Sequence, residues 1–132
     1  MKAGEIVKIL EDFAPNSIQE SWDNSGFMIG NEGAEVKSVL LALDCTPAVI
    51  EEAIESGADM IITHHPLIFS PLKRITGSGI VERMVERSIK NNLVIYSIHT
   101  NIDKVISGVS GLMAENLGLC NVRLLSKDES DN

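Results

Sequence analysis

The chain has 132 residues, the length of one ordinary domain and enough to bury an apolar core without a disulfide or a structural metal. Apolar residues make up 44% of the sequence, too many for a disordered chain, while aromatic residues contribute only 4%, so we expect an aliphatic core. The net charge of −8 argues against binding to nucleic acid or to an anionic membrane surface, since both need clustered Lys and Arg.

No segment of the sequence has the length of a membrane span or the composition of a signal peptide. The longest unbroken apolar run, from Val39 to Leu43, is five residues long, whereas a membrane-spanning helix needs about 20. The first ten residues carry three charged side chains, unlike the apolar core of a signal peptide. Cys45 and Cys120 lie far apart and form no CxxC motif, which favours reduced thiols in a cytoplasmic protein.

A helix is predicted over residues 5–13, where apolar residues recur at the spacing of one helix face. Its inner face is formed by Ile6, Ile9, Leu10 and Phe13. Residues 21–30, SWDNSGFMIG, begin with polar residues and contain two glycines, which is typical of a loop that leads into a short strand. We expect Trp22 in this loop to pack against the protein rather than to stack on a substrate.

Two buried strands are predicted on either side of a second helix. Residues 36–43 form the first strand, and the apolar residues 60–63 form the second. Between them, Thr46 offers a hydroxyl cap and Pro47 occupies the first helical position, so a helix begins there. Gly57 is the residue at which this helix is expected to end.

The rest of the chain continues the alternation of helices and strands. A loop over residues 67–76 precedes a third helix that Ser78 can cap. A third strand is predicted over residues 93–98 and a last helix over residues 105–117. Residues 122–125 have the composition of a short fourth strand.

This order of elements predicts an α/β fold, in which a mostly parallel sheet is covered by helices. Because the predicted strands are almost continuously apolar, we expect both faces of the sheet to be buried. The fold forms a single domain over residues 1–125, and the polar residues 126–132, SKDESDN, form a C-terminal tail.

All three histidines of the chain follow predicted strands. Asp44 follows the first strand, His64 and His65 follow the second, and His99 follows the third, with Asp103 four residues further on. The carboxyl ends of parallel strands share one edge of a sheet, and ligands bind at that edge in open α/β folds. We therefore expect these side chains to lie close together.

Imidazole and carboxylate groups together are typical ligands of Zn, Fe, Mn, Ni or Co ions. A metal held in this way lowers the pKa of bound water and makes a nucleophile near neutral pH. Asp44 is expected to orient a neighbour or to form a turn rather than to bind the metal. The competing interpretation is an α/β domain whose histidines are ordinary loop residues.

Three segments of the sequence resemble the NIF-three-like family, whose members are often labelled GTP cyclohydrolase I type 2 homologues. They are residues 21–30, residues 41–75 with the THHPLIF motif, and residues 96–103, YSIHTNID. The resemblance extends over residues 5–125. It implies a two-domain α/β subunit with a dinuclear divalent-metal site, and such subunits commonly assemble into a ring-shaped hexamer. This chain would be equivalent to the first half of that fold.

The resemblance also implies roles for individual residues. His64, His65 and Asp103 match the family's metal ligands, and the site takes one or two divalent ions per subunit. His99 and Asn101 belong to the same motif and would line the site. We assign His99 a tentative catalytic role, as a proton shuttle or a substrate contact.

The chain departs from the family pattern in its length. Family members are roughly twice as long, by analogy with their two domains, and their second half supplies a further His and a Glu to the metal pair. We therefore expect either a fragment or a natural half-protein. In the second case it forms a homo-oligomer, from dimer to hexamer, or binds a partner chain that supplies the missing half.

The leading hypothesis is a divalent-metal-binding domain with metal-dependent hydrolase-type chemistry on a small or nucleotide substrate. The alternative is a non-catalytic, oligomeric metal-binding or interaction module that lacks the second half of the site. Neither hypothesis includes a nucleic-acid partner or a membrane.

Overall fold

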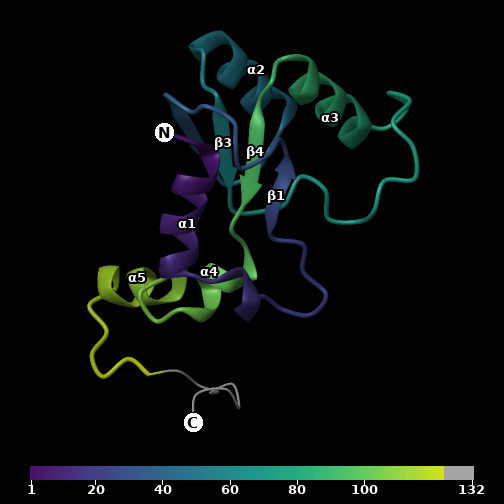
Figure 1. Ribbon diagram of the computed structural model, residues 1–132. Helices are drawn as coiled ribbons and strands as arrows, with labels where there is room; N and C mark the ends of the chain where they lie inside the picture. The colour runs from purple at the N-terminus through teal and green to yellow at the C-terminus, as the bar shows by residue number, and fades with distance from the viewer. Residues whose placement is uncertain (124–132) are drawn as a thin grey trace.

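The structure, a computed structural model, describes residues 1–123 and shows a mixed four-stranded sheet with helices on both faces (Figure 1). The elements in chain order are α1 (Ala3–Phe13), the 3-10 helix η1 (Asn16–Ile18), β1 (Gly26–Ile29), β2 (Val39–Ala42), α2 (Pro47–Ser56), β3 (Met60–Thr63), α3 (Ile80–Lys90), β4 (Val94–Ser97), α4 (Thr100–Lys104) and α5 (Val109–Asn116). The strand order is β1-β4-β3-β2.

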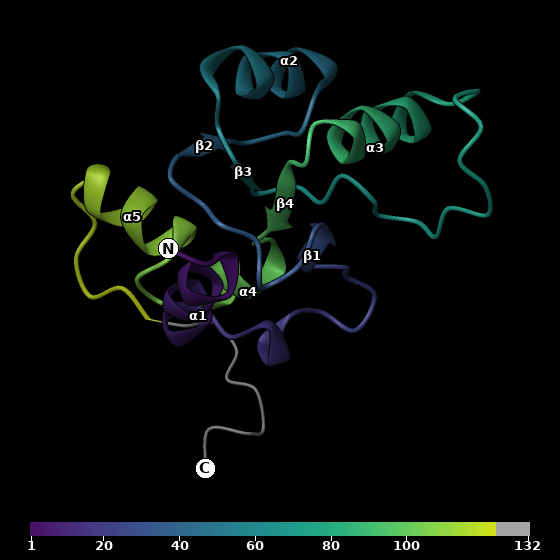
Figure 2. The ribbon, with the colours of Figure 1, turned by 45° about the horizontal axis from the view of Figure 1, so that its top comes forward.

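The sheet is mostly parallel, as the sequence predicts. β3 pairs in parallel with β2 on one side and with β4 on the other, while β1 pairs antiparallel with β4. The helices α2 and α3 cover one face of the sheet, and α1 and α4 lie on the other (Figure 2). The expected α/β class and the single domain are confirmed for the described residues.

The two central strands, β3 and β4, are buried on both faces. Because side chains alternate along a strand, Met60 and Ile62 join the core cluster under α1, whereas Ile61 joins the cluster under α2 and α3. Tyr96 of β4 is fully buried in the α1 cluster, and its hydroxyl accepts a hydrogen bond from Asn16 Nδ2 at 3.1 Å. These central strands provide a rigid base for the residues that follow them.

The helix α1 lies where it was predicted, and its predicted inner face is confirmed in part. Ile6 and Leu10 pack against the core cluster that contains Ala3. In contrast, Ile9 is 61% exposed and Phe13 is 46% exposed. The buried face is therefore rotated away from these two residues and toward the small side chain of Ala3.

The start and the end of α2 follow the local sequence. The Thr46 hydroxyl accepts a hydrogen bond from the Val49 amide at 3.3 Å, and Pro47 occupies the first turn. Gly57 ends the helix in the left-handed conformation, with φ of 71°. The predicted bounds of this helix are confirmed.

The sequence predicted that both faces of the strand β2 are buried, but the structure shows that one of its faces is exposed. It lies at the edge of the sheet, and its side chains alternate between exposed and half-buried. Leu40 packs against the cluster under α2, whereas Leu41 is 73% exposed and Leu43, just after the strand, is 62% exposed. The apolar run predicted burial, but the part of the chain described by the structure supplies no element that covers this face.

Of the helix predicted over residues 105–117, only residues 109–116 are helical and form α5, while residues 105–108 form a turn between α5 and the short helix α4, which the sequence did not predict. A Cβ atom at Gly108 would lie 1.9 Å from the carbonyl oxygen of Ile102, so only glycine permits this close approach. No residue of α5 is buried. Of the predicted fourth strand, Val122 and Arg123 lie in no strand, and residues 124–125 lie outside the described residues.

Ser78 was expected to cap α3, but the structure shows that it does not. Gly79 is the N-cap residue, and the Ser78 hydroxyl instead donates to the Glu82 carboxylate. The same carboxylate accepts hydrogen bonds from the amide and hydroxyl of Thr76, which lower the pKa of Glu82 to about 2. The loop before α3 is therefore held by the carboxylate of Glu82, which lies in the first turn of the helix. The usual pattern of a serine hydroxyl that caps a helix does not predict this interaction.

No helix within residues 1–123 is both long enough and apolar enough to cross a membrane.

We predict that the two cysteines differ sharply in reactivity. Cys45 is buried under α2, where desolvation raises the pKa of its thiol to about 11, whereas Cys120 is exposed. At neutral pH, one thiol per chain should react rapidly with a chromogenic disulfide reagent, and the second only after denaturation. Rapid reaction of both thiols in the native protein would contradict the packing of α2.

Candidate metal centre

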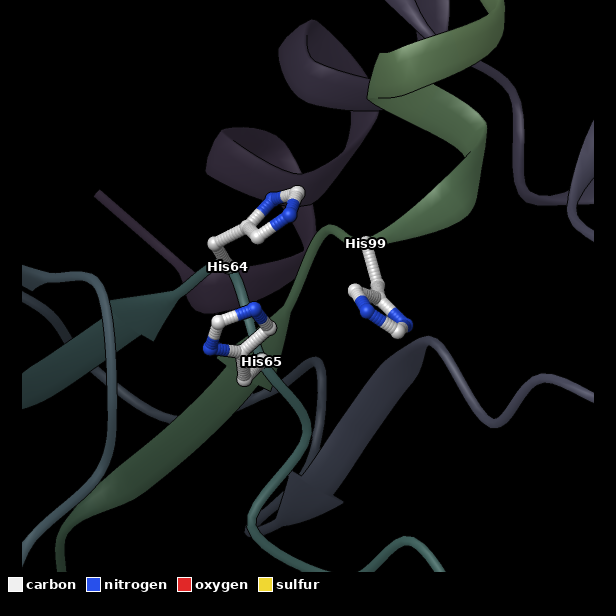
Figure 3. Close-up of side chains that lie close together, drawn as sticks. All are labelled: His64, His65 and His99. Atoms are coloured by element: carbon white, nitrogen blue, oxygen red, sulfur yellow. The ribbon is translucent and has the colours of Figure 1, made fainter. Parts of the chain in front are cut away.

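The three histidine rings meet at the carboxyl edge of the two central strands (Figure 3). His64 and His65 follow β3 directly, and His99 follows β4 after one intervening residue. The ring centroids are 4.8 Å apart for His64 and His65, 5.1 Å for His64 and His99, and 5.5 Å for His65 and His99. The expectation that the strand ends bring these side chains together is confirmed.

Backbone hydrogen bonds anchor the histidine pair to the neighbouring strand. The His64 amide donates to the carbonyl of Ala42 at 3.3 Å, and the His65 amide donates to the carbonyl of Leu43 at 3.0 Å. The buried hydroxyl of Thr63 donates to the His65 carbonyl at 2.9 Å, so the turn after β3 is closed from within. Both rings are thereby carried on restrained backbone rather than on a free loop.

The His64 ring is oriented by a main-chain carbonyl. Its Nδ1 atom lies 3.1 Å from the carbonyl oxygen of Ile98. A carbonyl oxygen can only accept, so the hydrogen-bonding proton lies on Nδ1, and in the neutral ring the lone pair lies on Nε2. The Nε2 atom is 3.7 Å from Asp103 Oδ2, at the rim of the centre.

Carboxylates orient the other two rings in the same way. His65 Nδ1 lies 2.7 Å from Asp44 Oδ1, and His99 Nδ1 lies 2.8 Å from Asp23 Oδ1. All three histidines therefore use Nδ1 for a hydrogen bond to an acceptor and keep Nε2 available. This is the usual arrangement of metal-binding histidines, whose second nitrogen is held by a carboxylate or carbonyl group.

The predicted ligand set is brought together only in part. One ligand nitrogen from each histidine lies within 4.8 Å of the others, so the three imidazoles form a group that can hold a metal ion. Among the ion pairs of residues 1–123, Asp103 takes part only in the one with His64, and its side chain is 41% exposed. Asp44 does not face the other rings but binds His65, consistent with the orienting role expected for it.

Asn101 is fully buried and faces away from the histidine rings. Its Nδ2 donates to the carbonyl of Ala14 at 2.8 Å and to Asn16 Oδ1 at 3.2 Å. Its Oδ1 accepts the amide hydrogen bond of His99 at 2.9 Å. Asn101 therefore supports the turn that carries His99, and a substrate could not reach it without disrupting the core.

Asp23 is a residue of the centre to which the sequence analysis assigned no role. Its side chain is 0% exposed, although it lies in the loop between η1 and β1. Burial alone raises the pKa of this carboxyl, but hydrogen bonds from His99, Thr100 and Asn24 outweigh burial and hold its pKa well below the usual range. The available signal was its position within the WDNSG segment that carries the family resemblance.

Two aromatic side chains stand beside the histidines. The Trp22 ring makes an edge contact with His99 at a centroid distance of 6.4 Å and lies 6.2 Å from Phe69. Trp22 was expected to pack against the protein, but beyond these ring contacts it remains 60% exposed, and Phe69 is 51% exposed. The loops that carry these rings lie outside the sheet, so no core closes over them within the described residues.

The sequence model of the family described as Duf34/NIF3 (NGG1p interacting factor 3) matches residues 1–131. The chain belongs to the Duf34/NIF3 family. It is 41% identical over 128 residues to a Clostridium acetobutylicum protein named "GTP cyclohydrolase 1 type 2 homolog", with 97% of this chain covered.

Two solved structures of family relatives resemble the fold closely. A Bacillus cereus protein related to NIF3 matches 97% of this chain with a TM-score of 0.90 and 41% identity. Reduced HcgD from Methanocaldococcus jannaschii matches 96% of this chain with a TM-score of 0.88 and 35% identity.

This NIF3 chain spans between a third and a half of the length of the curated relatives it matches. It covers 48% of the Clostridium acetobutylicum protein, 51% of HcgD and 36% of the Bacillus cereus protein. The matches therefore establish the family and the fold of this chain, whereas the activity in the relatives' names refers to the longer proteins.

The donor set of the centre suits a divalent transition metal. Three imidazoles with free Nε2 atoms and a nearby carboxylate match Zn, Fe, Mn, Ni or Co, whereas Ca and Mg prefer all-oxygen sites. The residues present thus fit the metal that the family resemblance implies.

We predict that Asn101→Ala destabilises the protein by about 1–3 kcal/mol, because it leaves the buried Ala14 carbonyl and the His99 amide without partners. Urea unfolding in the presence of EDTA measures this without a contribution from metal. Asn91→Ala is the matched control, since the Asn91 side chain makes an exposed hydrogen bond to the Arg87 carbonyl and should matter by less than about 0.5 kcal/mol. Equal losses in the two variants would contradict a structural role for Asn101.

Proposed function

We propose that this chain forms the divalent-metal site of a metal-dependent protein with hydrolase-type chemistry on a small or nucleotide substrate. The observation that supports this is the common orientation of the three histidines. Each Nδ1 is held by an acceptor, and the ligand nitrogens lie within 4.8 Å of one another. A set of ordinary loop histidines has no common constraint that would hold all three rings by Nδ1 in this way.

In this proposal His64, His65 and Asp103 bind the ion. His99 presents Nε2 to the same space, where its lone pair can bind the ion or accept a proton from a water molecule. One or two divalent ions are held per subunit, and the imidazole-rich donor set favours Zn, Fe, Mn, Ni or Co. When bound, such an ion lowers the pKa of coordinated water and supplies a nucleophile near neutral pH.

The neighbourhood of the rings supports chemistry on a small molecule. His65 is 48% exposed and Asp103 is 41% exposed, so solvent and a substrate can reach the centre directly. The relatives' name, GTP cyclohydrolase 1 type 2 homolog, makes a purine nucleotide the first substrate to test. The reduced thiols and the acidic composition are consistent with a cytoplasmic protein.

We predict that the double variant His64→Ala, His65→Ala loses stoichiometric uptake of Zn²⁺, because two of the imidazole donors are removed. Elemental analysis after gel filtration measures the bound metal. Trp22 is the only tryptophan of the chain and lies 6.4 Å from His99, so its fluorescence offers a second, label-free readout of binding. Glu86→Gln, which breaks an exposed ion pair on α3, is the control. Undiminished metal in the double variant would reject the ligand assignment.

A second candidate function is a non-catalytic, oligomeric metal-binding module, and the open face of β2 favours it. An open pocket on this face is lined by Leu41, Leu43 and Val109 together with His64 and His65. The apolar side chains of α5 continue the exposed surface: Val109, Leu112 and Met113. An apolar surface that reaches the metal centre is suited to a partner that covers the site. That partner is a further copy of this chain, in an assembly from dimer to hexamer, or a chain that supplies a second half.

Incubation of the metal-loaded protein with GTP and with simple phosphoesters separates the two candidates. Product formation that disappears in the His64→Ala, His65→Ala variant supports the hydrolase-type function. Absence of any product with each of the five metals supports the binding module.

We predict that Leu41→Glu shifts the protein from a homo-oligomer to a monomer in light scattering, because a charge is placed in the apolar face. Ile89→Glu, at a 54% exposed position on α3, provides the matched control and should leave the assembly intact. A wild-type protein that is monomeric at high concentration would count against self-association through this face.

A further inference from the structure

The Asp23 carboxylate is surrounded by hydrogen-bond donors on both of its oxygens. Oδ1 accepts from His99 Nδ1 at 2.8 Å and from the Asn24 amide at 2.7 Å. Oδ2 accepts from the Thr100 amide at 3.1 Å, from the Ser25 hydroxyl at 3.0 Å and from the Thr100 hydroxyl. Each oxygen thus receives at least one main-chain N–H group, which cannot reverse its polarity.

A relay fixes the direction of the Thr100 hydroxyl. Thr100 Oγ1 accepts a hydrogen bond from the Glu20 amide at 2.9 Å, and the same hydroxyl contacts Asp23 Oδ2. A carboxylate can only accept, so the hydroxyl proton points toward Asp23. The carboxyl group is therefore held in one rotamer and in its charged form by its neighbours, and its side chain has no exposure to solvent.

Asp44, which contacts His65, lacks this restraint. Its side chain is 55% exposed, and within residues 1–123 its carboxylate makes a hydrogen bond only to His65 Nδ1. The two carboxylates make the same contact with a histidine, but only Asp23 is fixed by further donors. In Asp44→Asn the amide can rotate so that its oxygen faces His65 Nδ1, whereas in Asp23→Asn the further donors fix the orientation of the amide.

We propose that Asp23 is a positioning residue that holds His99 in the tautomer with the proton on Nδ1, so that the Nε2 lone pair faces the metal centre. This inference deepens the proposed function and rests on it for its purpose, but the tautomer itself is a property of the metal-free protein. Either role of His99, as metal ligand or as proton acceptor, requires this lone pair on Nε2.

The variant Asp23→Asn tests the proposal because an amide has one oxygen and one NH₂ group. Three donors converge at the Oδ2 position, so the amide oxygen belongs there, and the NH₂ group then faces His99. The hydrogen bond from the Asn24 amide to the Oδ1 position is exposed, so a water molecule can serve as its acceptor when an NH₂ group stands there. Because the NH₂ group donates, Nδ1 of His99 must accept its hydrogen bond. The proton of the neutral imidazole then lies on Nε2, which no longer has a free lone pair.

Long-range ¹H–¹⁵N spectra of the imidazole rings report the tautomer directly. They are recorded on metal-free protein at alkaline pH, at which neutral rings predominate. In the wild-type protein we expect His99 to carry its proton on Nδ1, and in Asp23→Asn on Nε2. In Asp44→Asn we expect His65 to keep its Nδ1 proton, because the exposed amide can rotate and offer its oxygen.

A wild-type His99 that carries its proton on Nε2 would overturn the proposal, and this measurement does not depend on the folding of any variant. An unchanged His99 tautomer in a folded Asp23→Asn protein would overturn it as well. The proposed metal function fails on a separate observation, the absence of metal uptake by the wild-type protein, so the two failures are distinguishable.

Discussion

The hydrogen bonds to the Nδ1 atoms of three histidines are the interactions on which the candidate centre depends. An imidazole presents a lone pair at only one nitrogen in its neutral form, so the acceptor at Nδ1 decides which atom can bind a metal. The acceptors are a main-chain carbonyl for His64 and carboxylates for His65 and His99. They come from different segments of the chain, and only the folded sheet brings them into range of the rings.

The central strands provide the rigid part of this arrangement. β3 and β4 are buried on both faces and end at the same edge of the sheet, where the histidines follow. The buried hydroxyls of Thr63 and Ser97 bind each other at 2.9 Å across the two strand ends, so the ends are fixed relative to one another. Loop residues such as Asp23 then adjust the rings, because a loop can bring a carboxylate to a ring from outside the sheet.

The exposed edge strand β2 lies beside the candidate metal centre and forms part of the proposed partner surface. β2 is apolar like a central strand, yet it leaves Leu41 and Leu43 exposed next to the histidine pair. This chain covers 34% to 50% of the length of the curated relatives, and it contributes the three imidazoles and Asp103. An apolar surface beside the candidate metal site supports the proposal that a partner which binds there also completes the site.

By itself the sequence determined the α/β class, the mostly parallel sheet, the bounds of α2 and the meeting of the histidines, because these depend on local caps and on the periodicity of apolar residues. Tertiary structure alone decided that Ile9 and Phe13 of α1 are exposed, that β2 is an edge strand, that Trp22 stays exposed and that Asn101 is a core residue. It also brought Asp23 to His99, which lies 76 residues further along the chain. Contacts over such separations depend on packing, and no local pattern in the sequence encodes them.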